Sequence, residues 1–320
     1  MAPPILRVLR LGVTPYLTAL DLQSLAAARR AGRSATAASS SPSVFPLASA
    51  NSPRIPPSPD LLLALQHPPV VTIGKRQAIG ASHIIAGEDE LAARGVEVHR
   101  TARGGDVTFH GPGQAVLYPV LRLPDLRLGA RRYVEGLEDV MVRGAARFGV
   151  EARGRVPGMT GVWVGWDEEG SDGDSAGVDA SGGISGGDSN ITSEGGSGRK
   201  IGAVGVQISG GVTRHGLAFN ISTDLSFFKL IVPCGLEGKA VTSLNEERRR
   251  LAGKVRRIGG VEEGGNGRSV GTGATVSCDA VTDASVDVDV ETVTDVLIEE
   301  FVREFGFEEE RCSDEQQWLR

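Results

Sequence analysis

The chain has 320 residues, of which 40% are hydrophobic, so it can form one large domain or two. It contains no run of 18 apolar residues, which excludes a membrane-spanning helix. Its three widely spaced cysteines exclude a disulfide framework or a zinc site, and they indicate a reducing compartment. The net charge of −6 comes from residues 167–198, which hold eight acids and no lysine or arginine. The rest of the chain has 34 basic and 32 acidic residues, and this near-neutral balance excludes the basic surface of a nucleic-acid-binding protein.

The first 40 residues permit two interpretations. They contain five arginines, several serines and a single acid, Asp21, which is the composition of an organelle transit peptide. The same region contains ILRVLRLG (5–12) and PYLTALDLQSLAAARR (15–30), which predict a strand and an amphipathic helix of the domain itself. Composition alone does not decide between the two.

Strand and helix patterns continue after this region. Residues 68–74 (PPVVTIG) predict a buried strand, and residues 115–123 (AVLYPVLRL) predict another, in which Pro119 favours an edge position or a bulge. A helix is predicted over 131–148. Its apolar residues share one face: Tyr133, Leu137, Val140, Met141 and Phe148.

The C-terminal half adds a strand, a hairpin and a helix. Residues 161–165 (GVWVG) predict a strand, and the glycine pair 210–211 between 201–209 and 212–221 predicts a tight hairpin turn. Apolar residues predict a closing amphipathic helix: Val293, Val296, Leu297, Phe301 and Phe305. This mixture favours an α+β fold with a mixed sheet over a doubly wound fold.

Three segments are predicted to be flexible surface insertions. Residues 29–58, 167–198 and 246–285 have too little apolar surface to offset the entropy of ordering them. Without them 218 residues remain, which is the size of one domain. We therefore expect a single domain over residues 1–310, interrupted by these three segments.

A glycine-rich segment, RGGDVTFHGPGQ (103–114), is the first candidate for a binding loop. Its four glycines let the backbone approach a ligand or adopt positive φ, and Arg103, Thr108, His110 and Gln114 add hydrogen-bonding groups. It contains neither GxxxxGK[ST] nor a GxGxxG that opens a helix, so it is no phosphate-binding loop. By pattern alone, the glycines are also compatible with ordinary turns.

Cys234 is the candidate nucleophile, because it lies between Pro233 and Gly235 after a polar loop, which indicates an accessible turn. A thiol has an ordinary pKa of about 8.5, and a nearby ammonium group such as that of Lys200 would lower this pKa and increase the thiolate fraction. Taken singly, Cys234 could be a small buried hydrophobe, Lys200 a solvated charge and His215 a structural hydrogen-bond donor. Cys278 and Cys312 are less convincing nucleophiles.

These motifs together resemble those of the lipoyl(octanoyl) transferase family, the octanoyl-[acyl-carrier-protein]:protein N-octanoyltransferases. The resemblance runs in family order through HPPVVTIG (67–74), RGGDVTFHGPGQ (103–114), KIGAVGVQ (200–207), HGLAFNIS (215–222) and PCGLEGKAVTSL (233–244). It covers most of the 218-residue core. It implies the fold of the biotin and lipoate protein ligases, an α+β fold with a mixed β-sheet and packed helices.

The resemblance also implies the roles of individual residues. Cys234 matches the acyl-accepting nucleophile, and Lys200 matches the lysine that lowers the thiol pKa and relays protons. The matching substrate-binding residues are Arg103, Gly104, Gly105, Asp106, Val107, Thr108, Phe109, His110, Ala203, Val204, Gly205, Gly216, Leu217 and Ala218. Asp106 occupies a variable position, Phe109 replaces the usual tyrosine, and the segment 167–198 ends beside Lys200.

The implied reaction transfers an octanoyl group from octanoyl-acyl carrier protein to a lysine of a lipoyl domain, through a thioester on Cys234. The implied acceptors are the lipoyl domains of 2-oxoacid dehydrogenase complexes and the glycine cleavage H protein. One thioester replaces another, so no ATP, metal or other cofactor is expected. The resemblance and the long insertions indicate a mitochondrial monomer that binds neither nucleic acid nor membrane, with a plastid or the cytoplasm as alternatives.

Two rival functions remain open. One is an ATP-dependent lipoate or biotin protein ligase of the same fold, against which no adenylate-binding glycine and arginine signature is evident in the sequence. The other is a non-catalytic protein that binds acyl groups or lipoyl domains. Unlike a transferase, neither would move the octanoyl group from octanoyl-acyl carrier protein to a lipoyl domain.

Overall fold

The computed structural model describes residues 3–32, 59–76, 83–165, 198–233, 239–259 and 287–311. Most of the three predicted insertions lies outside these residues, and so do Cys234, Cys278 and Cys312. The expected flexibility of the insertions, the division of the chain into domains and the reactivity of Cys234 therefore stay predictions.

The strands of the described chain form two sheets. The larger is mixed and has seven strands in the order β10-β1-β2-β6-β9-β8-β7, and the smaller has three in the order β4-β3-β5. The strands are β1 (Ile5–Val13), β2 (Asp60–Gln66), β3 (Val70–Ile73), β4 (Glu97–Arg100), β5 (Val107–His110), β6 (Gln114–Val120), β7 (Val162–Val164), β8 (Arg199–Ser209), β9 (Val212–Asn220) and β10 (Glu308–Arg311). Strand β1 is parallel to β2 and β10, whereas the pairs from β2 through β7 are antiparallel.

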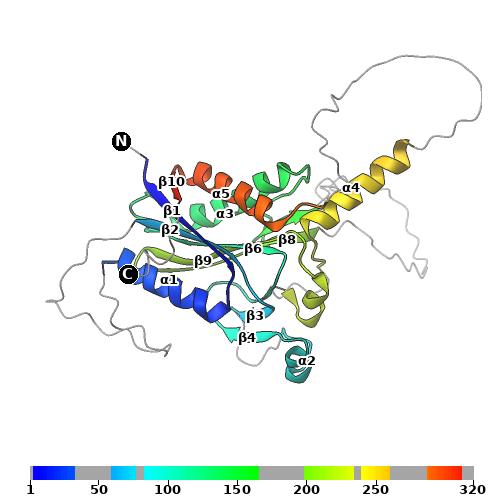
Figure 1. Cartoon of the computed structure of the whole chain (residues 1–320), viewed down its shortest axis with the longest axis horizontal. Helices are drawn as coiled ribbons and strands as arrows, with labels where there is room; N and C mark the ends of the chain where they lie inside the picture. Colours follow the sequence, from blue (N-terminus) through cyan, green and yellow to red (C-terminus); the bar gives the residue numbers. More distant parts are fainter. Residues whose placement is uncertain are drawn as a thin grey trace, which may run out of the picture.

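Helices cover both faces of the larger sheet (Figure 1). Helices α3 (Ala130–Ala146) and α5 (Val290–Phe305) pack together on one face, and α1 (Tyr16–Arg30) lies on the other. Shorter or more peripheral elements complete the described chain: α2 (Glu88–Ala93), the 3₁₀ helix η1 (Leu225–Leu230) and α4 (Leu244–Gly259). The expected α+β fold with a mixed sheet is confirmed.

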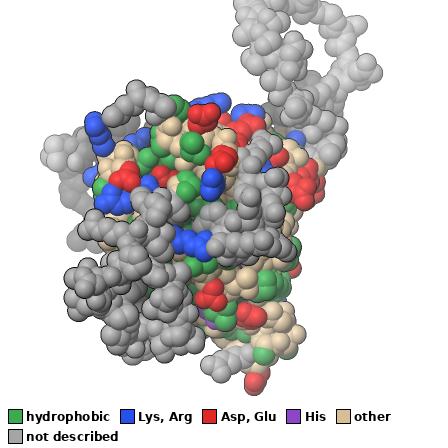
Figure 2. Space-filling model, turned by 60° about the vertical axis from the view of Figure 1, so that its left-hand side comes forward, with side chains coloured by type: hydrophobic (Ala, Val, Ile, Leu, Met, Phe, Trp, Pro, Cys, Tyr) green, Lys and Arg blue, Asp and Glu red, His purple; other side chains and the backbone are tan. Residues whose placement is uncertain are grey.

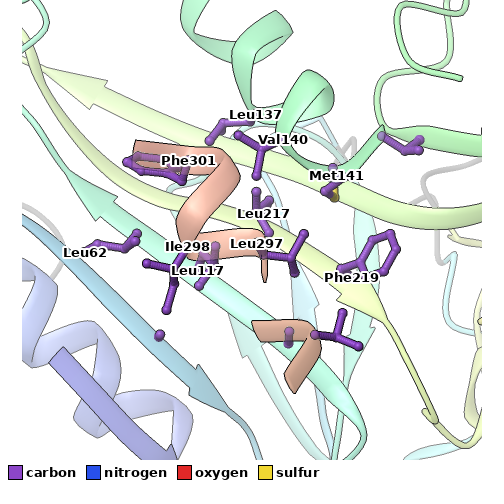
Figure 3. Packing of buried hydrophobic residues seen from close by; sticks show 14 of the residues in the cluster. Leu62, Leu117, Leu137, Val140, Met141, Leu217, Phe219, Leu297, Ile298 and Phe301 are labelled. Carbon is purple, nitrogen blue, oxygen red and sulfur yellow. The ribbon is translucent and has the colours of Figure 1, made fainter. Parts of the chain in front are cut away.

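The main core lies between the larger sheet and helices α3 and α5, as Figure 3 shows. The apolar face expected for the helix over 131–148 is buried there, and Phe148 packs against the core from beyond the helix end. Full burial of a leucine or phenylalanine side chain contributes ~1.5–3 kcal/mol. The labelled core residues are Leu62, Leu117, Leu137, Val140, Met141, Leu217, Phe219, Leu297, Ile298 and Phe301.

The hairpin and the closing helix form as their local chemistry predicts. Gly210 and Gly211 connect β8 to β9 and have φ of +58° and +80°. A two-residue hairpin turn of type I′ requires positive φ at both positions. Helix α5 begins after Asp289, whose side chain accepts a hydrogen bond from the Thr292 N–H at 2.8 Å, and it ends at Gly306, with φ of +69°.

The N-terminal strand and helix belong to the fold. Leu6 and Val8 of β1 are buried in the main core, while Ala19 and Ala26 of α1 pack against the opposite face of the sheet. Of the two interpretations of this region, the structure supports a strand and helix of the domain for residues 5–30.

Pro119 was expected at the edge of a sheet or at a bulge, and the edge position is wrong. Strand β6 occupies the middle of the larger sheet, between β2 and β9. The pairing of β6 with β9 stops at Leu117 and resumes in an isolated bridge at Arg122, so Pro119 falls in an interruption of the ladder. Gly216 on β9 leaves the space for its ring, because a Cβ there would lie 2.6 Å from Pro119 Cδ.

Two of the expected insertion boundaries also need correction. Residues 246–259 belong to α4, and the buried Glu247 of this helix forms a salt bridge with Arg199. Arg30 ends α1 as a buried residue, 2.8 Å from the carboxylate of Asp60. Both stretches were assigned to insertions because those segments contain little apolar surface, and the ion-pair partners that hold them lie far away in the sequence.

Charged side chains of both signs are interspersed on the molecular face in Figure 2, in agreement with the near-neutral balance expected outside 167–198. Ion pairs also connect α3 with α5, such as that of Arg143 with Glu300 at 2.9 Å. Among the described helices, none combines the length and apolarity needed to cross a bilayer.

Candidate active site

Two adjoining pockets lie between the 103–110 loop of the smaller sheet and strands β8 and β9 of the larger one. They share Thr108, Ala203 and Ala218. The larger pocket encloses about 530 Å³, including its open mouth. The predicted binding residues that line it are Arg103, Gly105, Asp106, Thr108, His110, Ala203, Val204, Gly205, Gly216, Leu217 and Ala218.

Three predicted binding residues, Gly104, Val107 and Phe109, do not line these pockets. Successive side chains of a strand point to opposite faces, so in β5 Thr108 and His110 face the pocket while Val107 and Phe109 enter an apolar cluster. The Phe109 ring stacks on Phe227, with centroids 4.7 Å apart. The phenylalanine in place of the usual tyrosine is therefore a packing residue in this protein.

Arg103 fixes the glycine-rich loop to the smaller sheet. Its guanidinium donates hydrogen bonds to the Thr72 carbonyl at 2.7 Å and the Thr72 hydroxyl at 2.8 Å, and to the Gly104 carbonyl at 3.0 Å. On the other side of the loop, the Gly104 N–H donates to the carbonyl of Val206 in β8 at 2.8 Å. Arg103 thereby joins the loop and both sheets at the pocket.

A chain of buried polar side chains runs along the two pockets and continues toward α4. Nδ1 of His110 lies 2.7 Å from Oε1 of Gln114, and the Gln114 amide donates to Oδ1 of Asn220 at 2.9 Å. Asn220 donates to the Thr242 carbonyl at 3.0 Å, and the Thr242 hydroxyl donates to Glu247 at 2.6 Å. Because each buried polar group here has a partner, the network fixes the β5, β6 and β9 ends against the segment that precedes α4.

Two buried histidines, His110 and His215, line the larger pocket, and a third, His67, lies next to them with its ring centroid 5.7 Å from that of His110. Burial lowers the pKa of His67 to about 4 and the pKa values of His110 and His215 to about 3. His67 bonds through its two ring nitrogens to the Thr14 carbonyl and the Tyr118 hydroxyl, at 2.7 and 2.8 Å. The pocket therefore carries no imidazolium charge at neutral pH.

The burial of these histidines predicts that acid destabilises the protein. Their pKa is ~6.5 in the unfolded chain, so between about pH 6.5 and 4 the unfolded state binds more protons than the folded state, and the free energy of unfolding falls as the pH falls. Each histidine contributes a slope of up to ~1.4 kcal/mol per pH unit. Urea denaturation at several pH values measures this slope, and His67→Gln should reduce it.

His99→Gln is the matched control, because the His99 side chain is 23% exposed and lies beside Glu97 at the surface. This variant should keep the slope of the original protein. Equal slopes in the two variants would contradict the assignment of the acid sensitivity to buried histidines.

Lys200 is held firmly although a long insertion precedes it. It is 6% exposed, and its Nζ donates to the Thr160 carbonyl at 2.9 Å and lies 5.3 Å from the centre of the Trp163 ring. Its backbone N–H donates to the Ala240 carbonyl, and its own carbonyl accepts from the Thr242 N–H, both at 2.9 Å. The lysine is therefore fixed between β7 and the 240–242 segment.

The segment that leads to Cys234 approaches Lys200. Pro233, which directly precedes the cysteine, lines the same small pocket as Lys200. The Val232 N–H donates to the His83 carbonyl at 2.7 Å, and Nδ1 of His83 lies 2.9 Å from the Asp106 carboxylate. This ties the approach to Cys234 to the binding loop. The cysteine itself lies outside the described residues.

Several pocket residues were not predicted as site residues from the sequence. Gln114 was noted as a hydrogen-bonding group of the glycine-rich segment but not as a binding residue, and Asn220 lies within the HGLAFNIS motif, so their polar side chains beside binding residues were a usable signal. Tyr16 and Thr160 come from helix α1 and from the turn before β7, and no local pattern marks them. Among the described residues, no group of three His, Cys, Asp or Glu side chains is arranged to hold a metal.

Residues 50–253 match the family of the lipoyl protein ligase A/B catalytic domain. The chain is 39% identical over 246 residues to the mitochondrial octanoyltransferase LIP2 of Arabidopsis thaliana, covering 77% of this chain and 80% of that protein. It is 40% identical over 252 residues to the octanoyltransferase of Rubrobacter xylanophilus, covering 77% and 87%. A crystal structure of lipoate-protein ligase A bound with ATP resembles it with a TM-score of 0.55 at 15% identity, over 98% of this chain and 91% of that one.

The chain therefore belongs to the lipoyl protein ligase A/B catalytic domain family. Within this family, the curated relatives quoted above are octanoyltransferases, and the predicted lipoyl(octanoyl) transferase membership, acyltransferase class and ligase-like fold are confirmed. The likeness to the ATP-bound ligase, at 15% identity, concerns the fold alone.

Proposed function

We propose that this octanoyltransferase moves the octanoyl group from acyl carrier protein to a lysine of a lipoyl domain, through a thioester on Cys234. The observation that carries the proposal is the buried Lys200 ammonium in the pocket that Pro233 also lines. The octanoyltransferase relatives support the same reaction. The acceptors in this proposal are the lipoyl domains of 2-oxoacid dehydrogenase complexes and the glycine cleavage H protein.

The proposed first step exchanges one thioester for another. The Cys234 thiolate attacks the octanoyl carbonyl, the new C–S bond forms, and the C–S bond to the carrier breaks. The Lys200 ammonium gives its proton to the departing carrier thiolate and becomes a neutral amine. Small side chains and the apolar Leu217 line the adjacent slot, which suits an unbranched acyl chain: Gly202, Ala203, Leu217 and Ala218.

The proposed second step forms the amide. The acceptor lysine attacks the acyl-enzyme as a free amine, the neutral Lys200 accepts its proton, and the Cys234 thiolate departs beside the regenerated ammonium. Atoms and charges balance over the two steps without ATP. Lys200 needs a fixed position for both proton transfers, and its contacts with Thr160 and the 240–242 segment support this requirement.

Intact mass spectrometry tests the proposal. Incubation with octanoyl-acyl carrier protein should add one octanoyl group to the original chain and none to Cys234→Ser. Octanoate with ATP in place of the carrier protein should give no transfer to a lipoyl domain, whereas turnover with ATP would indicate a ligase. Binding of the carrier without an adduct would indicate a non-catalytic binding protein.

We also propose that the protein acts in mitochondria as a monomer. The support for the compartment is the relative from Arabidopsis thaliana, which is named as mitochondrial. Fractionation of cells that produce the tagged full chain tests the location, and light scattering of the purified chain tests the monomer. Recovery in the cytosol, or a mass of twice the 33.5 kDa chain, would contradict these two proposals respectively.

A further inference from the structure

A buried carboxylate on α3 lies outside the pockets and has an unusual pair of partners. Glu138 is 3% exposed, and its two oxygens accept hydrogen bonds from backbone N–H groups, one from Gly161 at 2.7 Å and one from Arg155 at 2.9 Å. Both donors belong to the 153–163 segment, which connects the core to β7. A carboxylate is expensive to bury, so its position here requires an explanation.

The Gly161 N–H belongs to the same amide group as the Thr160 carbonyl. That carbonyl accepts a hydrogen bond from the Lys200 Nζ at 2.9 Å. One peptide group therefore lies between a buried anion and a buried cation, with its N–H toward Glu138 and its C=O toward Lys200. Charge-assisted hydrogen bonds are stronger than neutral ones, and each end of the amide polarises the other.

This amide needs external support to keep its orientation. Gly161 has φ of +119°, and a Cβ at this position would lie 2.5 Å from the Gly202 carbonyl oxygen and 2.7 Å from the Lys200 Cε. The segment is closed on itself by a pair of backbone hydrogen bonds between Arg153 and Trp163, at 2.7 and 2.8 Å. Glu138 adds the contact that ties the turn to the core helix.

We infer that Glu138 is a positioning residue for Lys200, acting through the Thr160–Gly161 amide. Its negative charge orients this amide so that the carbonyl faces the lysine. The inference rests on the proposed function, in which Lys200 activates the Cys234 thiol. Glu138 itself lines neither of the two pockets.

The test is the substitution Glu138→Gln, which preserves size but removes the charge and one acceptor oxygen. The rate of Cys234 alkylation at pH 7, followed by peptide mass mapping, should fall about tenfold, and its pH midpoint should rise by about one unit. In octanoyl transfer, kcat should fall while the KM for the carrier protein stays within a factor of about two. An unchanged alkylation profile would overturn the inference.

Glu300→Gln is the matched control. Glu300 is a buried carboxylate on α5, 1% exposed, with Arg143 and Arg303 as its partners at 2.9 and 3.0 Å. Loss of the Glu300 charge should lower the free energy of unfolding and leave the pH profile of Cys234 alkylation unchanged. An equal shift in both variants would show that the effect reports general loosening of the core, which would also overturn the inference.

A second comparison isolates the path through Lys200. In a Lys200→Met background, Glu138→Gln should change the alkylation rate by less than about twofold, because residues that act as a unit are not additive. The full tenfold effect in that background would contradict the inference. Alkylation needs no octanoyl donor, so an absent octanoyl adduct on the original chain would refute the proposed function separately.

Hydrogen exchange on the original chain provides a measurement that does not depend on the folding of any variant. The Gly161 amide should exchange slowly, at a rate close to that of core strand amides, because its N–H donates a hydrogen bond to the buried Glu138 carboxylate. Exchange at the rate of an exposed loop amide would overturn the inference.

Discussion

Lys200→Met is expected to reduce octanoyl transfer to a lipoyl domain by about 10³-fold or more. Methionine has a similar length but no charge and no proton to exchange. At an ordinary pKa of ~8.5 only a few per cent of a thiol is ionised at pH 7, so loss of the ammonium should slow Cys234 alkylation about tenfold. Loss of a positioned proton-transfer group typically costs a further ~10²–10⁴ in rate.

The two half-reactions should respond differently to Lys200→Met. Acyl-enzyme formation, read by intact mass in a rapid-quench experiment, should slow mainly through the smaller thiolate fraction and should partly recover at pH 9. Transfer to the acceptor lysine should not recover, because no group remains to accept its proton. Lys229→Met is the control, since Lys229 is exposed on η1 and should leave both rates unchanged. A fully active Lys200→Met enzyme would remove this lysine from the mechanism.

Gly216→Ala is expected to destabilise the protein by about 3 kcal/mol or more, because it overpacks the middle of the larger sheet. The added Cβ would lie 2.2 Å from the Leu117 carbonyl oxygen and 2.6 Å from Pro119 Cδ. Backbone atoms and a proline ring cannot move aside as the flexible end of a long side chain can. Since Gly216 also lines the larger pocket, the strain should weaken binding of the octanoyl donor.

Thermal and urea denaturation measure the effect of Gly216→Ala, and Gly129→Ala is its matched control. Gly129 precedes α3 with φ of −84°, and a Cβ there would meet no atom within 4 Å. The control should cost no more than about 1 kcal/mol, because Gly129 is the N-cap of α3, where alanine is less favourable than glycine but meets no steric clash. Equal stability of the two variants would contradict the close packing of β6 against β9.

The elements set by local chemistry were the ones that the sequence predicted well. The tight turn at Gly210 and Gly211 and the apolar face of α3 depend on neighbours within a few residues. The pocket loop followed from the RGG and HGPGQ pattern, although the sequence alone could not tell which of its side chains face inward. That distinction depends on the alternation within β5, which leaves Phe109 in an apolar cluster.

The features that the sequence did not reveal depend on distant pairings. Pro119 appeared to mark an edge because nothing near it in the chain indicates that Gly216 makes room for it in a central strand. Glu247 looked like part of a charged loop because its partner Arg199 is 48 residues away. Likewise, the contact of Glu138 with the 160–161 amide exists only once α3 packs beside β7.

The pairing of Val164 with Arg199 has a consequence for the evolution of this chain. Because Val164 and Arg199 are neighbours in the sheet, the free-energy cost of joining them grows only with the logarithm of the number of residues between them, about 0.6 kcal/mol per doubling. Insertions and deletions can therefore change the length of this stretch almost freely without shifting Lys200, the residue after Arg199. An ancestor with a short connection between Val164 and Arg199 and a descendant with a long one would share the same reaction centre.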